Sequence, residues 1–234
     1  MIDRPIKAVL SDMYGTLLYE DGGIEFSYAQ MARRAGLDVE AFTRARNVTF
    51  RDSLTGALPD GVRRAEAILA VMGLPASEER AREVAQAELM TRVPAVHLYP
   101  ATMPTLLALR ARGYRLGLIS DCTYLWRSVI QRVGLESLFD AITLSNEVGT
   151  TKPDPVMYLK TCQALGVQPE ECVYVGDGGS DELEGARALN IVPVLIDQQY
   201  GVTRLRQSRY HDFCIANLRE LLDLLPPRAG EGQG

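Results

Sequence analysis

The sequence predicts an α/β fold in which a doubly wound parallel sheet carries an inserted α-helical segment. First, short apolar runs alternate with helical patterns after residue 95, as a parallel sheet covered on both faces requires. Second, residues 20–95 show apolar residues only at helical spacing. Third, polar residues follow several of the expected strands, at the sheet edge where such folds bind their ligands.

The first expected strand covers residues 7–12, ends at Asp12 and is followed by a turn at Gly15. The later strands are short and apolar, which is typical of strands buried on both faces. They are expected at residues 115–120, 141–145, 172–176 and 191–196. Helices are expected at residues 103–112, 124–133, 155–165 and 180–189. We therefore expect the core of the protein to comprise residues 1–19 and 96–225.

Residues 20–95 are expected to form a helical cap of about four helices, separated by glycine and proline. The expected cap helices are residues 26–35, 39–50, 63–72 and 80–89. Tyr124 and Trp126, which open a core helix, are expected to serve packing. The Pro- and Gly-rich end of the chain, residues 226–234, is expected to be a disordered tail.

Composition excludes several classes of function. Hydrophobic residues make up 47% of the chain and charged residues 24%, as in ordinary globular proteins. The net charge of −5 gives no electrostatic support for binding nucleic acid or an acidic membrane surface. No signal peptide or membrane span is visible, and four scattered cysteines suit free thiols in the cytoplasm. The expected partner is a small anionic molecule, bound by a monomer or a homodimer.

Three residues at or just beyond strand ends can carry chemistry on an anionic substrate. The carboxylate of Asp12 can act as a nucleophile. Ser120 can donate a hydroxyl and a backbone N–H, and Lys152 can supply a positive charge. Each residue alone has a plain structural alternative, a turn or capping side chain or a solvated lysine. Only their order along the chain favours a functional site.

The acidic residues Asp177 and Asp181 lie four positions apart, where a strand turns into a helix. Carboxylate oxygens in a flexible loop suit Mg²⁺, although a helix cap and a first-turn acid give the same pattern. The sequence therefore predicts a candidate magnesium site at the same sheet edge as Asp12.

Together these motifs resemble those of the haloacid dehalogenase superfamily, over roughly residues 7–200. The motifs that carry the resemblance are Asp12-Met13-Tyr14-Gly15-Thr16-Leu17, Ser120-Asp121, Lys152-Pro153-Asp154-Pro155 and Gly176-Asp177-Gly178-Gly179-Ser180-Asp181. The resemblance implies a Rossmann-like core whose helical cap closes over the site and selects the substrate.

The resemblance also implies roles for individual residues. Asp12 would be the nucleophile, and Tyr14 and Lys152 would take part in catalysis. The implied ligands of Mg²⁺ are Asp12, the backbone carbonyl of Tyr14, Asp177 and Asp181. The implied substrate-binding residues are Thr16, Ser120, Asp121 and Lys152.

One position departs from the phosphatase pattern. Phosphatases of this family usually carry an aspartate two residues after the nucleophile, and this chain has Tyr14 there, as 2-haloacid dehalogenases do. A phenol is a poor base near neutral pH. Dehalogenases, however, lack an acid at the position of Asp177 and usually have asparagine at that of Asp121. Two motifs therefore support the phosphatase and one supports the dehalogenase.

The sequence thus favours Mg²⁺-dependent hydrolysis of a small phosphate monoester through an aspartyl-phosphate on Asp12. One alternative is a metal-independent 2-haloacid dehalogenase that forms an ester on Asp12. Another is a non-catalytic regulator that binds a phosphate ester. The group that activates water is unassigned, with Tyr14, Asp181 and a cap residue as candidates.

Overall fold

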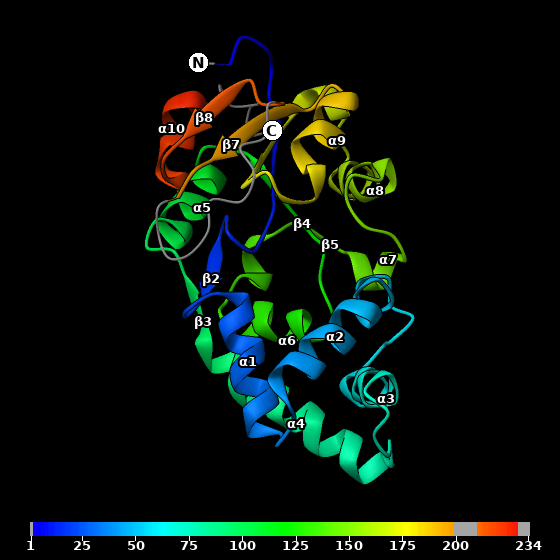
Figure 1. Ribbon diagram of the computed structural model, residues 1–234. Coiled ribbons are helices and arrows are strands. Elements are labelled where there is room, and N and C mark those ends of the chain that lie inside the picture. Colours follow the sequence, from blue (N-terminus) through cyan, green and yellow to red (C-terminus); the bar gives the residue numbers. More distant parts are fainter. Residues whose placement is uncertain (1, 199–209, 229–234) are drawn as a thin grey trace.

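The computed structural model describes residues 2–198 and 210–228, and a six-stranded sheet lies at the centre of this part of the chain. Its strand order is β5-β4-β1-β6-β7-β8, and all neighbouring strands run parallel. The strands are β1 (Ala8–Ser11), β4 (Arg115–Ser120), β5 (Ala141–Leu144), β6 (Cys172–Gly176), β7 (Val192–Ile196) and β8 (Phe213–Ile215). The predicted doubly wound α/β fold is therefore confirmed, with β1 near the middle of the sheet (Figure 1).

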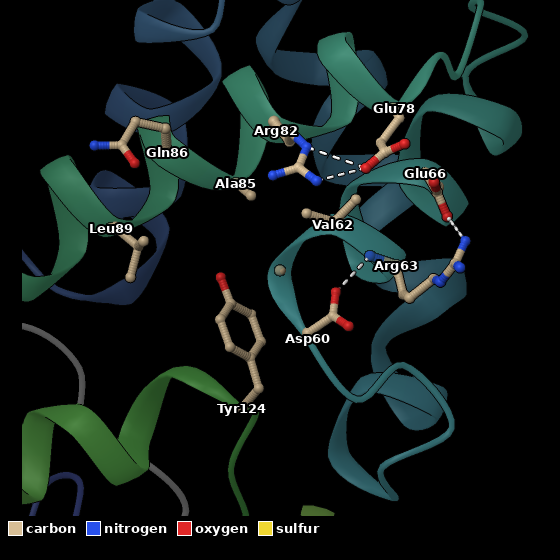
Figure 2. Close-up of a pocket in the computed structure, with 11 residues that line it drawn as sticks. Asp60, Val62, Arg63, Glu66, Glu78, Arg82, Ala85, Gln86, Leu89 and Tyr124 are labelled. Carbon is tan, nitrogen blue, oxygen red and sulfur yellow. Dashed lines mark hydrogen bonds and ion pairs between the residues drawn. The ribbon is translucent and has the colours of Figure 1, made fainter.

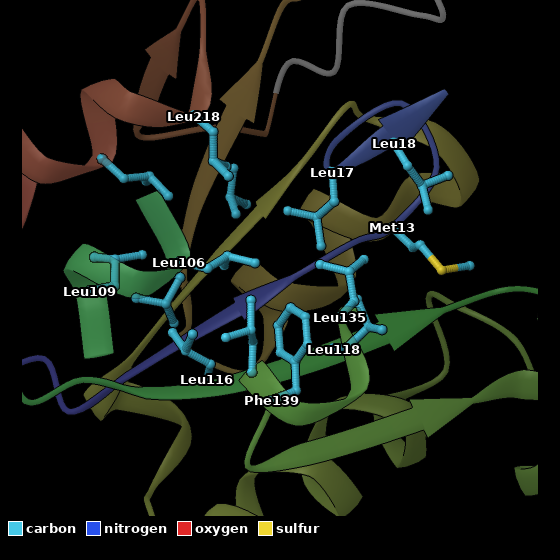
Figure 3. Packing of buried hydrophobic residues seen from close by; sticks show 14 of the residues in the cluster. Met13, Leu17, Leu18, Leu106, Leu109, Leu116, Leu118, Leu135, Phe139 and Leu218 are labelled. Atoms are coloured by element: carbon cyan, nitrogen blue, oxygen red, sulfur yellow. The ribbon is translucent and has the colours of Figure 1, made fainter. Parts of the chain in front are cut away.

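Helices cover both faces of this sheet because successive strand residues point to opposite sides. Val9 belongs to one buried cluster, whereas its neighbours Ala8 and Leu10 belong to the other. The first cluster is completed by α5 (Thr102–Ala111), α6 (Leu125–Arg132) and α10 (Leu221–Leu224). The second is completed by α8 (Pro155–Leu165) and α9 (Glu182–Ala188). Figure 3 shows side chains of the first cluster, which include Leu106 of α5 and the strand residue Leu116.

Four helices, which we call the cap, lie between β1 and β4 in the chain: α1 (Ile24–Arg34), α2 (Val39–Leu54), α3 (Gly61–Val71) and α4 (Glu78–Ala95). They share a buried cluster of their own, which includes Phe42 and Ile68. The side chains of Asp38, Asp60 and Ser77 cap α2, α3 and α4 by accepting hydrogen bonds from backbone N–H groups. Figure 1 shows the cap below the sheet, on the side where β4 and β5 end.

Two short strands that the sequence pattern did not predict, β2 (Leu18–Glu20) and β3 (Val96–Leu98), connect the cap to the core and pair antiparallel. Three residues are too few to show a period-two pattern. The helix predicted to end at residue 89 also continues through Pro94 to Ala95. Arg92 explains this extension, since it is buried and forms an ion pair with Glu20 of β2.

Other elements differ from the predicted ones. Helix α9 begins at Glu182 rather than at residue 180, because Ser180 and Asp181 have φ angles of 53° and 50°, outside the right-handed helical region. The sequence pattern also missed β8 and α10, as well as the single-turn helix α7 (Ser145–Val148). Four 3₁₀ turns complete the described structure: Glu136–Leu138, Pro169–Glu171, Gly179–Asp181 and Leu218–Glu220.

The predicted tail begins with residues that are bonded to the core. The hydroxyl of Tyr114 donates to the carbonyl of Pro226 at 2.7 Å, and the backbone N–H of Arg228 donates to the carbonyl of Arg112 at 3.1 Å. Residues 229–234 lie outside the described residues. Among the helices of residues 2–198 and 210–228, none combines the length and the apolar character that a membrane crossing needs.

Two neighbouring leucines of α5 test this packing. Leu106 is 1% exposed and Leu107 is 52% exposed. We expect Leu106→Ala to lower the free energy of unfolding by about 2–5 kcal/mol, because it leaves a cavity beneath the sheet. The control Leu107→Ala is expected to change it by no more than about 0.5 kcal/mol. Urea denaturation followed by circular dichroism measures both, and equal losses would contradict the assigned packing.

Candidate functional site

The C-terminal ends of β1, β4 and β6 bring three predicted site residues to one edge of the sheet. Asp12 follows β1, and its backbone N–H donates to the carbonyl of Val175 in β6 at 2.9 Å. Ser120 is the last residue of β4, and Asp177 directly follows β6. Both strands pair with β1, so these residues meet beside the candidate nucleophile. Asp12 and Ser120 are buried, which separates them from bulk water.

Lys152 holds the centre of the site. Its ammonium nitrogen lies 2.5 Å from Asp12 Oδ1 and 2.5 Å from Glu182 Oε2, and 3.3 Å from the hydroxyl of Tyr174. Burial by itself would lower the pKa of Lys152, but the carboxylates of Asp12 and Glu182 outweigh burial and hold this pKa well above its ordinary value. Lys152 therefore stays protonated and presents a fixed positive charge beside the candidate nucleophile.

Asp121 positions the loop that carries this lysine. Its Oδ1 accepts a hydrogen bond from the backbone N–H of Lys152 at 2.9 Å. Burial raises the pKa of Asp121 despite the nearby lysine. The predicted substrate-binding residue Thr16 lies near the other oxygen of the nucleophile, with its hydroxyl 3.5 Å from Asp12 Oδ2. Thr16 and Asp121 thus hold the two catalytic candidates in place.

Glu182 is the site residue that the sequence analysis missed. The Tyr174 hydroxyl donates to Glu182 Oε2 at 2.8 Å, and the backbone N–H of Gly178 donates to Oε1 at 3.1 Å. A Cβ atom on Gly176 would lie only 2.0 Å from Oε1, so this glycine leaves the room that the carboxylate occupies. Burial, opposed by Lys152, raises the pKa of Glu182 to about 8.

Asp181, the predicted metal ligand beside Glu182, is exposed and lies outside this carboxylate cluster. The left-handed backbone at Ser180 and Asp181 delays the start of α9 by two residues relative to the predicted helix. As a result, Glu182 is the buried acid of the first helical turn. The sequence does carry a signal for this residue, since Glu182 directly follows Asp181. It lies five positions after Asp177, one more than the spacing of four that predicted Asp181.

Asp177 completes a group of three carboxylates. Ligand oxygens of Asp12, Asp177 and Glu182 all lie within 4.8 Å of one another. Burial, together with the charge of Asp12, raises the pKa of Asp177 to about 6. A Cβ atom on Gly15, whose φ is +81°, would lie 2.3 Å from Asp177 Oδ2. Gly15 is therefore required both by its backbone conformation and by the close approach of this carboxylate.

The chemistry of this cluster fits a divalent cation. Three carboxylates lie around one lysine, with Asp121 close by, and burial opposes the charged forms of Asp177 and Glu182. A hard cation with oxygen ligands would offset the remaining negative charge. Of the ligands predicted for Mg²⁺, the structure brings Asp12 and Asp177 together, and Glu182 joins them.

Tyr14 is turned toward the cap connection. Its ring packs edge-on against Trp126, with ring centroids 6.1 Å apart. Burial, reinforced by the charge of Glu20, raises the pKa of the Tyr14 phenol to about 12. The phenol therefore keeps its proton at neutral pH, so it can donate a proton but cannot act as a base.

Curated proteins similar to this chain include two glyceraldehyde 3-phosphate phosphatases. The one from Methanopyrus kandleri is 34% identical over 140 residues, which cover 54% of this chain and 56% of that protein. The match thus spans little more than half of that relative. The one from Methanocaldococcus jannaschii is 26% identical over 230 residues, which cover 94% of this chain and 97% of that protein.

Solved structures match over nearly the whole chain. A HAD phosphatase from Thermococcus onnurineus is 27% identical with a TM-score of 0.67, over 96% of this chain and 100% of that one. A 2-haloacid dehalogenase from Pseudomonas syringae has a TM-score of 0.71 at 23% identity, over 94% of this chain and 97% of that one, and shows the fold alone. The family model for haloacid dehalogenase-like hydrolases matches residues 6–190, which contain Asp12, Lys152 and the acidic cluster. The chain belongs to the haloacid dehalogenase-like hydrolases.

Proposed function

We propose that this protein hydrolyses a small phosphate monoester with the help of Mg²⁺, through an aspartyl-phosphate on Asp12. The observation that carries the proposal is the group formed by the buried Asp12 and Glu182 and the half-buried Asp177, with the ammonium of Lys152 between Asp12 and Glu182. A phosphate monoester adds nearly two negative charges to such a site, so a cation is needed before a carboxylate can approach phosphorus. The phosphatases among the similar proteins support the same reaction class.

In the first step, a carboxylate oxygen of Asp12 attacks phosphorus, and the bond from phosphorus to the ester oxygen breaks. The leaving alcohol takes up a proton. In the second step, water attacks the acyl phosphate, which releases inorganic phosphate and regenerates the Asp12 carboxylate. Lys152, which already contacts Asp12 at 2.5 Å, would stabilise the charge on the transferring group, and Ser120 and Thr16 would bind its oxygens.

Asp12, Asp177 and Glu182 are the side chains that would hold Mg²⁺, with the backbone carbonyl of Tyr14 as a further ligand. When bound, the ion supplies positive charge that offsets the repulsion between the carboxylates and the phosphoryl oxygens. Tyr14 is the proposed proton donor to the leaving group: its phenol holds a proton at neutral pH, and its pKa of about 12 makes it a weaker acid than an ordinary phenol. No described side chain is assigned as the base that activates water.

The substrate is proposed to be a small phosphorylated metabolite. Relatives of this chain are named as phosphatases of glyceraldehyde 3-phosphate, phosphoserine and phosphoglycolate, so these three esters form the first test panel. Cys122, Cys162 and Cys172 are buried free thiols, which supports a reducing, cytoplasmic setting for this reaction.

The alternative is a 2-haloacid dehalogenase that forms an ester on Asp12. Tyr14 favours it, because its phenol stands where the phosphatases of the family usually carry an aspartate. The acidic cluster opposes it, since a carboxylate substrate without a cation would meet uncompensated negative charge. A protein that binds phosphate esters without turnover would also keep this site.

A paired assay separates these functions. We expect release of phosphate from at least one ester in the panel when Mg²⁺ is present, and loss of that activity when a chelator removes the ion. No halide should appear from 2-chloropropionate under either condition. Halide release that survives the chelator would establish the dehalogenase instead, and saturable binding of an ester without turnover would establish the regulator.

Replacement of the nucleophile tests the covalent mechanism. Asp12→Asn should lower kcat/KM by about a thousandfold or more, because the amide cannot form the acyl phosphate. The protein should stay folded, since the two side chains are similar in size. The matched control is Asp181→Asn, at an exposed acid outside the cluster, which should leave kcat/KM within about twofold. Turnover by Asp12→Asn at the wild-type rate would rule out the mechanism.

Thermal unfolding with and without Mg²⁺ tests the ion site independently of activity. The pKa of Asp177, about 6 in the folded protein, lies above its ordinary value of 3.8. Its contribution to stability is therefore fully present below about pH 3.8 and is lost as the pH rises through about 6. An ion bound to the deprotonated cluster offsets this loss.

We therefore expect Mg²⁺ to raise the Tm clearly at about pH 7.5 and much less at about pH 5, where a proton competes for Asp177. Asp177→Asn and Glu182→Gln should both reduce the shift at the higher pH, whereas Asp181→Asn should retain it. Equal shifts at the two pH values, or a shift that depends on Asp181 and not on Glu182, would contradict the assigned ligands.

A further inference from the structure

A tyrosine of the core reaches into the cap. Tyr124 directly precedes α6, four residues after Ser120, and its hydroxyl donates a hydrogen bond to Glu88 Oε2 of α4 at 3.0 Å. Glu88 is only 1% exposed, so bulk water does not compete for this bond. The contact joins the loop that leaves the candidate site to the longest helix of the cap.

The partner of this tyrosine is held rigidly. Glu88 accepts hydrogen bonds from Arg64 of α3 and, at 3.3 Å, from Arg92 of α4. Arg92 in turn forms an ion pair with Glu20 of β2, at 2.5 Å. The two positive charges of these arginines balance the two negative charges of the glutamates. Both guanidinium groups also donate hydrogen bonds to the hydroxyl of Tyr28. The acceptor of the Tyr124 bond is thus held in place by its two arginine partners.

The cap helices α3 and α4 leave room for the ring of Tyr124. Figure 2 shows the ring of Tyr124 rising toward α4, beside Ala85 and Leu89, at a cavity of about 580 Å³ between α3 and α4. A Cβ atom on Gly61, at the start of α3, would lie 2.5 Å from the Tyr124 hydroxyl. The absence of a side chain at Gly61 therefore lets the ring take this position.

The loop of residues 121–124, which contains Tyr124, is linked to the cap a second time through Ser145. The hydroxyl of Ser145 donates to the carbonyl of Leu54, at the end of α2, at 2.7 Å, and accepts from the backbone N–H of Cys122 at 2.9 Å. Asp121, the residue before Cys122, holds the backbone of Lys152. The loop from Asp121 to Tyr124 therefore contacts the cap directly through Tyr124 and is linked to it a second time through Ser145 of α7, while Asp121 binds the backbone of Lys152.

We propose that Tyr124 is a cap-positioning residue, which holds the cap in place against the core through its hydrogen bond to Glu88. It acts through the cap and does not touch the reacting atoms. A cap held in place excludes water and keeps substrate in the site, so a loosened cap lowers substrate affinity more than it lowers the rate of the bound complex. The kinetic part of this proposal rests on the proposed phosphatase activity, whereas the part on cap position does not.

The test is Tyr124→Phe, which removes the hydroxyl and leaves Glu88 paired with both arginines. We expect KM for the preferred phosphate ester to rise about tenfold, as the loss of one hydrogen bond to a charged group allows, with kcat within about twofold. The matched control is Tyr114→Phe, which removes a hydroxyl that donates to the carbonyl of Pro226, within the core. This control should leave KM unchanged.

Trp126 gives a readout that needs no substrate. It is the one tryptophan of the chain, and it lies under the guanidinium of Arg92 in the cap, 5.5 Å from it, and beside Tyr14. Quenching of its fluorescence by acrylamide should increase in Tyr124→Phe and not in Tyr114→Phe. Gly61→Ala, which displaces Tyr124 from the cap side, should act in the same direction.

The outcomes separate the two proposals. A Tyr124→Phe variant that melts at a lower temperature but keeps its KM and its tryptophan quenching would overturn the positioning role. If no ester is hydrolysed by the wild type, the phosphatase proposal fails, and increased quenching in both Tyr124→Phe and Gly61→Ala would still support the positioning role. Unchanged quenching in both variants would overturn it.

Discussion

The structure of the candidate site depends on one buried ammonium among several carboxylates. Lys152 contacts Asp12 and Glu182 at 2.5 Å each, while Asp177 lies in the same cluster without a lysine contact. Burial, together with the neighbouring carboxylates, outweighs the one ammonium that the described residues place here, and raises the pKa of Asp177 and that of Glu182. The excess of carboxylates makes this an oxygen-rich site whose chemistry fits a cation.

The fold produces this arrangement by bringing strand ends together. Because β1 lies between β4 and β6, the residues that follow these three strands share one edge, although about 165 positions separate Asp12 from Asp177. Two glycines then allow the carboxylates to approach, since a side chain at Gly15 or Gly176 would collide with them. The close approach of these carboxylates therefore depends on the two glycines as well as on the acidic residues.

The cap is linked to this edge by a second group of buried charges, which unlike the first is balanced. Arg92 pairs with Glu20 and Glu88, and all three are almost fully buried. Balanced pairs with further hydrogen bonds make a rigid contact and offer no charge to a ligand. The excess of negative charge at the candidate site thus lies in the core, while the balanced charges at the cap connection lie beside Trp126 and Tyr14 and hold that region in a fixed geometry.

The sequence by itself determined the α/β fold, the strands that end at Asp12, Ser120 and Asp177, and the family motifs, because periodic burial and turn residues act locally. Only the tertiary structure decided that Glu182, rather than Asp181, joins the acidic cluster. That choice depends on a left-handed turn and on the space beside Gly176, neither of which a spacing of acids encodes. The ion pair of Arg92 could not be predicted from the sequence either, since its partner Glu20 lies 72 positions away. The two residues meet only because β2 and the end of α4 come together in the fold.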